Sequence, residues 1–223
     1  MSQKLFNYDA KLRKNKNIKL LCGIDETGRG CWAGPLVAAA VIFKPDDFID
    51  GINDSKKLSA SQRLLLEKEI KSNCLSYAIA EIDVDTIDKK GITYANTHAM
   101  VNAAMKAAHN INLNTEEIEL FVIDQSPCKK LTPFVMMEKA DSISASVAAA
   151  SILAKTHRDR IIDKISDKYP EYSFNNHKGY INKLHVDLVN KFGLIDGIHR
   201  KSYSVTGFNR PVQINMMDFI NET

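Results

Sequence analysis

The sequence predicts an α/β domain built on a mixed β-sheet. Three short strand-like segments come first, and an alternation of strands and helices follows them. Two of the apolar strands run directly into carboxylates, at positions where α/β sheets place their sites. The chain has 223 residues, of which 44% are hydrophobic and 26% charged. This size and composition suit one globular domain.

Five segments have the length and apolar pattern of strands. Residues 36–43 are almost continuously apolar, which is typical of a buried sheet member. Residues 75–82 alternate apolar and polar side chains, as a half-buried strand does. The remaining strands are expected at 19–26, which leads into a glycine-rich turn, at 119–124 and at 134–137.

Four segments have helical spacing. Ser59 and Ser61 mark the start of the first helix, and Gly193 supplies the stop of the last. The aliphatic and methionine positions of residues 93–108 are expected in the core. We expect helices around residues 64–70, 93–108, 142–168 and 179–192.

The charge balance excludes a protein that binds polyanions by charge alone. Thirty Lys and Arg residues face 27 Asp and Glu residues, a net charge of only +3. Positive charge is concentrated at the start, where the first twenty residues hold six Lys or Arg and one acid. This segment is either a solvated, frayed end or a basic arm that contacts phosphate.

No segment of the sequence predicts secretion or membrane insertion. The basic start has no apolar run behind it, and no stretch approaches 18 uninterrupted apolar residues. The four cysteines are scattered and form no C-x-x-C pair, which argues against a zinc site. We therefore expect reduced thiols in a cytoplasmic protein.

The segment G-I-D-E-T-G-R-G, residues 23–30, is the first candidate site. Asp25 and Glu26 are neighbours on a strand, so one carboxylate projects into a site directly and the other reaches it from the strand end. A strand-ending turn with solvated acids is the alternative. Gly28, Arg29 and Gly30 favour a ligand, since glycines allow close backbone approach and the arginine offers phosphate contacts.

Two further acids are candidates for the same cluster. Asp124 ends another apolar strand. Asp141 opens the long helical segment, where it is either an N-cap or a site residue. Asp159 returns to the same helical face, but about 27 Å along the axis separates it from Asp141. Because Asp141 follows a strand closely, we select Asp141.

Four clustered carboxylates require positive charge. Two divalent ions would balance Asp25, Glu26, Asp124 and Asp141, and oxygen ligands favour Mg²⁺ or Mn²⁺ over Zn²⁺. Such a pair activates water and stabilises the leaving oxygen in phosphodiester hydrolysis.

Several motifs resemble the bacterial ribonuclease HII family. The segment D-E-T-G-R-G followed by A-G-P-L-V-A-A-A-V is similar to the family's opening motif, and D-S-K-K-L at 54–58 to its next segment. The stretch D-S-I-S-A-S-V-A-A-A-S-I-L-A-K at 141–155 resembles its most distinctive helix. H-K-G-Y at 177–180 and I-H-R-K-S at 198–202 resemble its closing motifs. The matches run in family order from about residue 20 to 203.

The resemblance implies an RNase H-like fold with a small C-terminal helical extension. It also implies hydrolysis of RNA in RNA–DNA hybrids and cleavage 5′ of single ribonucleotides in duplex DNA, leaving 5′-phosphate and 3′-OH ends. The implied roles are ribonucleotide removal and degradation of primer RNA. The family's metal-binding acids correspond to Asp25, Glu26, Asp124 and Asp141.

The resemblance also assigns substrate contacts. Gly28, Arg29 and Gly30 correspond to a loop that follows the backbone and the 2′-OH at the RNA–DNA junction, and Tyr180 to a junction-sensing tyrosine. Lys56 is expected to contact phosphate or to lie in a solvated loop. Lys155 is likewise expected to contact phosphate, and the alternative is a position on the helix surface. The motif histidines are expected to make structural hydrogen bonds rather than bind metal: His177, His185 and His199.

The chain departs from the family pattern at a few positions. Gln125 stands where a glycine usually follows the third acid, and its side chain is expected to crowd the site or bind water. The other departures are Thr27, Trp32, Ala140, Ile181 and Asn182. None removes a carboxylate.

These observations predict a basic segment at 1–18, a catalytic domain at 19–205 and a tail at 206–223 that either docks a partner or is a frayed end. The start leaves no room for the extra N-terminal domain usual in the sister family ribonuclease HIII. We expect no obligate protein partner. Alternative functions are another RNase H-like DNA nuclease and a non-catalytic hybrid-binding module.

Overall fold

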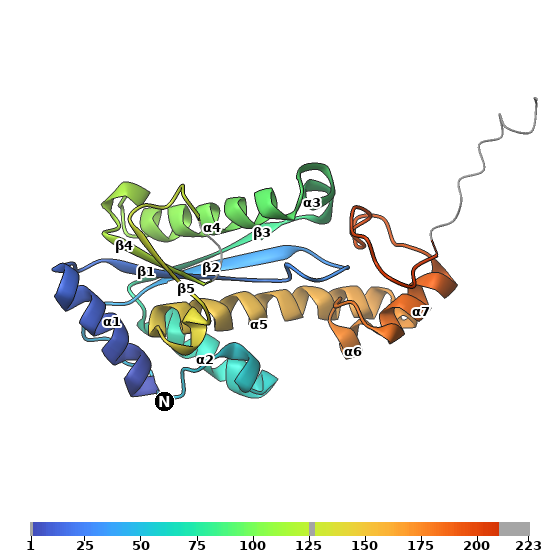
Figure 1. The fold of residues 1–223 in the computed structure, drawn as a ribbon. Helices are drawn as coiled ribbons and strands as arrows, with labels where there is room; N and C mark the ends of the chain where they lie inside the picture. Colours follow the sequence, from blue (N-terminus) through green and yellow to red (C-terminus); the bar gives the residue numbers. More distant parts are fainter. Residues whose placement is uncertain (1, 125–127, 210–223) are drawn as a thin grey trace, which may run out of the picture.

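Five strands form one mixed sheet with helices on both faces (Figure 1). The computed structural model describes residues 2–124 and 128–209. The strand order is β3-β2-β1-β4-β5, in which the first three strands are antiparallel and β1, β4 and β5 run parallel. The sheet confirms the predicted fold class. Its strands are β1 (Leu21–Thr27), β2 (Leu36–Ile42), β3 (Ser76–Ile82), β4 (Leu120–Asp124) and β5 (Phe134–Met137).

Strand β1 lies at the centre of the sheet and sets the position of the acidic residues. It pairs with β4 in parallel, with Ile24 opposite Ile123. The residue that follows in each strand is an aspartate, Asp25 in β1 and Asp124 in β4. The parallel register therefore brings both carboxylates to the same edge of the sheet.

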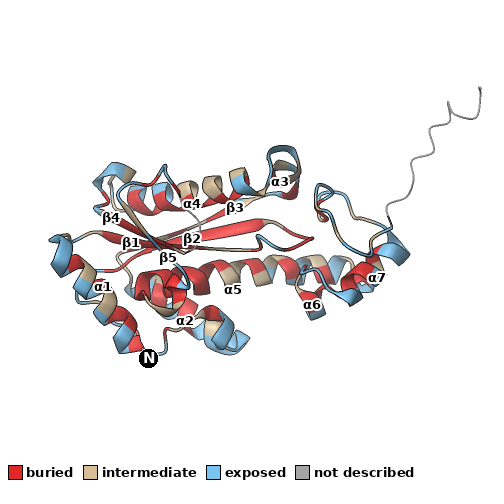
Figure 2. Ribbon diagram, in the orientation of Figure 1, coloured by how far each residue is buried: buried red, intermediate tan, exposed pale blue. Residues whose placement is uncertain are grey.

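Alanine-rich helices cover the two faces. Helix α4 (Ile92–His109) packs on one face, and α5 (Ala145–Lys168) packs on the other together with α1 (Ser2–Lys16) and α2 (Ala60–Asn73). The half of α5 under the sheet is buried on most sides, whereas its far half is partly exposed (Figure 2). A Cβ at Gly23 would overlap the backbone of Ser146, so β1 and α5 approach too closely for any side chain there.

A smaller group of helices lies beyond the sheet at the end of α5. It comprises α6 (Phe174–His177) and α7 (Lys183–Phe192), packed around the buried Trp32. The expected helix at 179–192 begins later, because Asn182 caps α7 through the backbone N–H of His185. Helix α3 (Val84–Lys90), which precedes α4, was not predicted.

Other helix starts and one core position differ from the predictions. Helix α2 begins after Ser59, which forms a capping box with Gln62, as the sequence indicates. Helix α5 is capped by Ser144, and Asp141 lies before it in a separate 3-10 turn, Ala140–Ser142. The N-cap alternative for Asp141 is therefore wrong. Met105 is 52% exposed, so the prediction that it belongs to the core is wrong as well.

The basic N-terminal segment is ordered as a helix. Leu5 and Phe6 of α1 are buried against the core around Phe43. Asp9 accepts hydrogen bonds from the backbone N–H and the hydroxyl of Ser146 at 2.9 and 2.6 Å, and Arg13 donates to the carbonyl of Phe43. The alternative of a frayed end is therefore wrong for Ser2–Lys16.

The sequence predicts reduced thiols and no membrane-spanning segment, and the structure bears on both expectations. The cysteines are free thiols, and Cys22, Cys31 and Cys128 are buried. Among the residues that the structure describes, no helix has the length and apolar character needed to cross a membrane.

Candidate active site

The four predicted acids converge at the edge of the sheet where β1 and β4 end. Asp25 is buried, and it accepts a hydrogen bond from the backbone N–H of Glu26 at 2.8 Å. Burial raises the pKa of Asp25 well above its usual range, and the negative charges of Glu26, Asp124 and Asp141 raise it further. Asp25 is thus electrostatically coupled to all three of the other acids.

A hydrogen bond ties the strand-end acid Asp124 to the turn that carries Asp141. The backbone N–H of Ala140 donates to Asp124 Oδ1 at 3.0 Å. Asp141 follows in the same turn and is almost fully buried. The hydrogen bond therefore links the two aspartates through the turn, although they are 17 positions apart in the sequence.

The cluster has more negative charge than its surroundings neutralise. Burial raises the pKa of Glu26 to about 7, and Asp124 adds to this, while the positive charge of Arg29 opposes it. Burial likewise raises the pKa of Asp141, against the effect of the Lys56 ammonium 3.1 Å away. Glu26 Oε2 is buried and has no hydrogen-bond partner among the described residues. An unpartnered buried carboxylate oxygen of this kind is a ready cation ligand.

The donor set fits a divalent cation in its chemistry, although the carboxylates of the described residues form no closed cage. Within residues 2–124 and 128–209, no three His, Cys, Asp or Glu side chains stand in a ready-made ion site. The available ligands are carboxylate oxygens, which suit Mg²⁺ or Mn²⁺. Gln125, expected to crowd the site, lies outside the described residues.

The glycine loop after β1 has two distinct glycines. Gly28 has φ +91°, and a Cβ there would lie 2.5 Å from Arg158 Nε, so the fold itself requires glycine. A Cβ at Gly30 would meet no atom of the described residues within 4 Å. The space beside Gly30 is therefore open to a ligand, as a substrate-contacting loop requires.

Tyr180 lies next to this loop. Its backbone forms an isolated antiparallel bridge with Cys31, directly after Gly30. Its side chain is 44% exposed, and its ring lies 6.0 Å from Lys155 Nζ and 5.9 Å from the Arg158 guanidinium. The loop and the tyrosine are thus direct neighbours in the fold.

The structure places the predicted lysines at the edge of the site, each with a carboxylate partner. Lys56 contacts Asp141, as described above. Lys155 Nζ lies 2.6 Å from Asp159, which also accepts from Arg63 at 3.1 Å. Arg63 in turn donates to the carbonyls of Ser55 and Leu58, on either side of Lys56. Asp159 therefore belongs to an ion-pair network that supports the Lys56 turn.

Two buried arginines were not recognised as structural from the sequence. Arg200, in the I-H-R-K-S motif, is fully buried and donates to the carbonyls of Gly34 and Arg29. Arg158, also fully buried, donates to the carbonyls of Ala33, Pro35 and Lys178. These guanidinium groups bind main-chain carbonyls of the loop and of the segment before Tyr180. The only sequence signal is arginine next to motif residues, which does not distinguish substrate contact from scaffold.

Three buried histidines lie behind Tyr180, and two of them, His199 and His185, form a directional hydrogen-bond chain to its carbonyl. The N–H of Ile195 donates to His199 Nδ1, so the proton of His199 resides on Nε2 and is donated to His185 Nε2 at 3.2 Å. His185 then donates from Nδ1 to the carbonyl of Tyr180 at 2.9 Å. His177 accepts from the N–H of Gly179 and donates to the carbonyl of Tyr172. The predicted structural hydrogen bonds of these histidines are confirmed.

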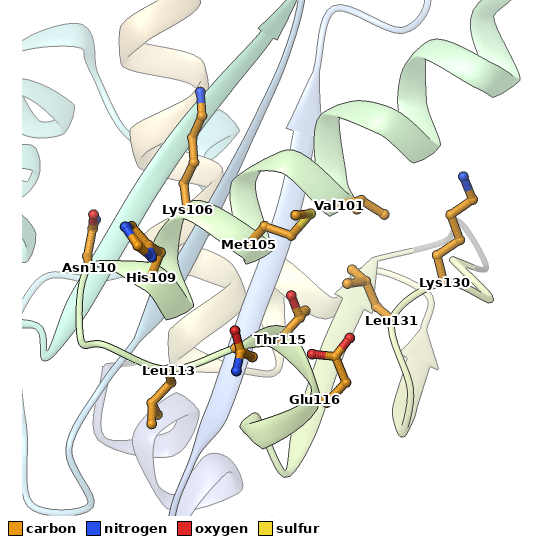
Figure 3. A pocket seen from close by; sticks show the side chains of 11 residues that line it. Val101, Met105, Lys106, His109, Asn110, Leu113, Thr115, Glu116, Lys130 and Leu131 are labelled. Carbon is orange, nitrogen blue, oxygen red and sulfur yellow. The ribbon is translucent and has the colours of Figure 1, made fainter.

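A pocket of about 480 Å³ lies elsewhere, between the end of α4 and the segments around residues 113–116 and 130–131 (Figure 3). Its lining combines the apolar Met105 and Leu113 with the polar Lys106 and Glu116. None of the predicted site residues lines it. The candidate active site is therefore the open edge of the sheet rather than this pocket.

Comparisons with known proteins agree with this architecture. The family model described as Ribonuclease HII matches residues 22–206. The ribonuclease HII of Chloroherpeton thalassium is 41% identical over 197 residues, which cover 86% of this chain and 93% of that protein. Among solved structures, the ribonuclease H2 of Pyrococcus horikoshii superposes with a TM-score of 0.68 at 23% identity, covering 82% of this chain and 93% of the other. Bst-RNase HIII in complex with Mn²⁺ gives a TM-score of 0.65 at 18% identity, covering 83% and 67% respectively.

Proposed function

Because the chain belongs to the ribonuclease HII family and is an endoribonuclease, we propose that it hydrolyses the RNA strand of RNA–DNA hybrids. We also propose that it cuts duplex DNA on the 5′ side of a single embedded ribonucleotide. The products are a 3′-OH and a 5′-phosphate. Such an activity serves removal of ribonucleotides from DNA and degradation of primer RNA.

The four acids are the catalytic and metal-holding residues in this proposal. Asp25, Glu26, Asp124 and Asp141 would hold the divalent cations on which this family's chemistry depends, and we propose two ions, Mg²⁺ or Mn²⁺. Bound there, the ions supply the positive charge that activates water and stabilises the leaving oxygen. The Mn²⁺ complex of the structurally similar Bst-RNase HIII supports this choice. The observation that carries the proposal is geometric: the parallel register brings Asp25 and Asp124 to one edge of the sheet, and the Ala140 N–H ties the turn of Asp141 to Asp124.

The loop and the tyrosine supply recognition. We assign the backbone of Gly28, Arg29 and Gly30 to the 2′-OH, the group that distinguishes RNA from DNA. Tyr180 presents an exposed ring for packing against the neighbouring deoxyribose. Lys56 and Lys155, at the edge of the acids, would meet phosphates by exchanging their carboxylate partners.

The remaining proposals concern the domain bounds, the substrate, protein partners and the cellular compartment. We place the catalytic domain at residues 19–205, with 1–18 and 206–223 as flanking segments. The substrate is a hybrid or a ribonucleotide-containing duplex, and we propose no obligate protein partner. The free thiols support a reducing compartment, which we propose is the cytoplasm.

Three labelled duplexes of one sequence test this function: all DNA, DNA with one ribonucleotide, and an RNA–DNA hybrid. Each is incubated with the wild-type chain and with Asp124→Asn, in Mg²⁺ and in Mn²⁺. The amide introduced by this substitution retains an oxygen for the Ala140 N–H, so the variant is expected to fold and to bind duplex. We expect metal-dependent cleavage only where a ribonucleotide is present, and loss of turnover in the variant.

Other outcomes would overturn the proposal. Equal cleavage of the all-DNA duplex would identify a DNA nuclease of the same fold. Hybrid binding without product in either metal would identify a non-catalytic binding module. Near-normal cleavage by Asp124→Asn would contradict the role of the four acids.

A further inference from the structure

The main-chain carbonyl of Arg29, in the middle of the glycine loop, receives two hydrogen bonds from the closing segment of the domain. Tyr203 Oη donates to it at 2.6 Å, and Arg200 Nη1 donates to it at 3.1 Å. Arg200 Nη1 also donates to Tyr203 Oη at 2.9 Å. The three groups close a triangle in which the tyrosine hydroxyl both accepts and donates.

The guanidinium in this triangle is also anchored at Gly34, four residues beyond the glycine loop. Arg200 is fully buried, and its Nε and Nη2 donate to the carbonyl of Gly34 at 3.1 and 2.8 Å. No ion pair joins Arg200 to a carboxylate in the described part of the chain. Its charge is therefore directed at the two loop carbonyls, which fixes Arg29 relative to Gly34.

Tyr203 is itself held in place from outside the loop. The carboxylate of Asp88, on α3, accepts hydrogen bonds from the backbone N–H of Lys201 at 2.9 Å and of Ser202 at 3.0 Å. It also accepts from the Ser202 hydroxyl at 2.6 Å. The backbone of Arg200 is attached to the loop by its N–H, which donates to the carbonyl of Trp32 at 2.8 Å. Tyr203 thus directly follows residues 200–202, which are held by Trp32 and by Asp88.

From these contacts we infer that Tyr203 is a positioning residue for ribonucleotide recognition, acting through the Arg29 carbonyl. The inference rests on the proposed role of Gly28, Arg29 and Gly30 in contacting the 2′-OH. Backbone groups recognise a hydroxyl only when their position is fixed, since hydrogen bonds weaken steeply with distance and angle. The Tyr203 hydroxyl supplies one of the hydrogen bonds that fix the centre of this loop.

The inference predicts a selectivity effect rather than a uniform loss. A duplex with one ribonucleotide offers a single 2′-OH in one register, whereas a hybrid offers one at every position of its RNA strand. Imprecise positioning of the loop should therefore lower kcat/KM more for the single-ribonucleotide duplex than for the hybrid. Loss of one neutral hydrogen bond that acts on only one of the substrates corresponds to a change of about fivefold in the ratio of their kcat/KM values.

The test compares Tyr203→Phe with the matched control Tyr172→Phe. The hydroxyl of Tyr172 also donates to a main-chain carbonyl, that of Gly193 at 2.8 Å, but in the helical group away from the loop. The measured quantity is the kcat/KM for the single-ribonucleotide duplex divided by that for the hybrid, with the melting temperature of each variant recorded. We expect the ratio to fall about fivefold in Tyr203→Phe, with hybrid cleavage retained, and to stay at the wild-type value in Tyr172→Phe.

The outcomes separate this inference from the function on which it rests. A wild-type chain that does not require a ribonucleotide contradicts the proposed function. A wild-type chain that requires one, together with an unchanged ratio in Tyr203→Phe, contradicts only the inference. An equal fall of the ratio in both variants also overturns it, because the effect would then follow general destabilisation.

Discussion

Lys56 Nζ lies 3.1 Å from Asp141 Oδ2, joining a largely exposed lysine to a nearly buried carboxylate. The lysine side chain is 75% exposed and that of the aspartate 3%. The ammonium therefore approaches the acidic cluster from the solvent side, which is also the side from which a polyanionic substrate arrives. In this arrangement Lys56 partly neutralises the acids until divalent cations do so.

Replacement of Lys56 should make the fold more dependent on divalent cations. In Lys56→Met the buried Asp141 loses its partner, and we expect a loss of about 1 kcal/mol, since the exposed lysine is well screened. For a domain of this size this corresponds to a decrease of about 2–4 °C in melting temperature. Added Mn²⁺ should raise the melting temperature more in Lys56→Met than in the wild type.

Lys57→Met is the matched control for this measurement, because among the carboxylates of the described residues Lys57 approaches only Asp54, at 4.0 Å. Thermal melts with and without Mn²⁺ on all three proteins decide the point. Equal Mn²⁺ responses in the two variants would show that Lys56 does not neutralise the cluster.

Substitution of Gly28 should affect the stability of the fold, whereas substitution of Gly30 should affect substrate binding. Gly28→Ala forces a side chain into a positive-φ position against Arg158, which costs about 1–3 kcal/mol and lowers the melting temperature by several degrees. Gly30→Ala adds a methyl group in open space, so its melting temperature should stay near that of the wild type. We expect its KM for the single-ribonucleotide duplex to rise instead.

Melting curves and steady-state kinetics on both variants test this division. A stable Gly28→Ala protein would contradict the structural account of that glycine. Wild-type kinetics in Gly30→Ala would contradict close approach of a substrate to the loop.

The histidine network should make the fold sensitive to mild acid. Burial and neighbouring histidines lower the pKa of His199 to about 3, and burial lowers the pKa of His185 to about 4, against an ordinary value of 6.5. Below pH 6.5 the unfolded chain takes up protons that the folded chain does not. The stability from these neutral histidines is therefore complete above that pH and is lost as the pH falls towards 4 and 3.

His199→Gln removes one of these groups without introducing another titrating side chain. We expect the variant to melt below the wild type at about pH 7.5, and the difference to narrow by about pH 5.5. Melting temperatures of both proteins across this range test the prediction. A constant difference would show that protonation of His199 is not linked to unfolding.

The sheet was predictable because its strands are short apolar runs, but α1 was not. Its buried positions include Asp9 and Arg13 beside Leu5 and Phe6, so no simple apolar stripe marks the helix. The start of α5 was predicted three residues early because several capping residues, from Asp141 to Ser144, follow one another there. In the structure Ser144 caps the helix through the backbone N–H of Val147.

The acids were predictable because carboxylates at the ends of neighbouring parallel strands must meet at one edge. The groups that hold the glycine loop could not be predicted, because the contact between Tyr203 and Arg29 joins residues 174 positions apart. The burial of Arg200 was also hidden, because a motif arginine is usually read as a surface charge. Such long-range positioning becomes visible only in the folded chain.

Asp141, rather than Asp159, completes the acidic cluster with Asp25, Glu26 and Asp124, and the proposed function depends on this assignment. The most direct test is single-turnover cleavage of the single-ribonucleotide duplex by Asp141→Asn and by Asp159→Asn. We predict that Asp141→Asn loses cleavage by a factor on the order of 1,000 or more, while Asp159→Asn stays within about tenfold of the wild type. Near-normal cleavage by Asp141→Asn, or a greater loss in Asp159→Asn, would contradict the assignment.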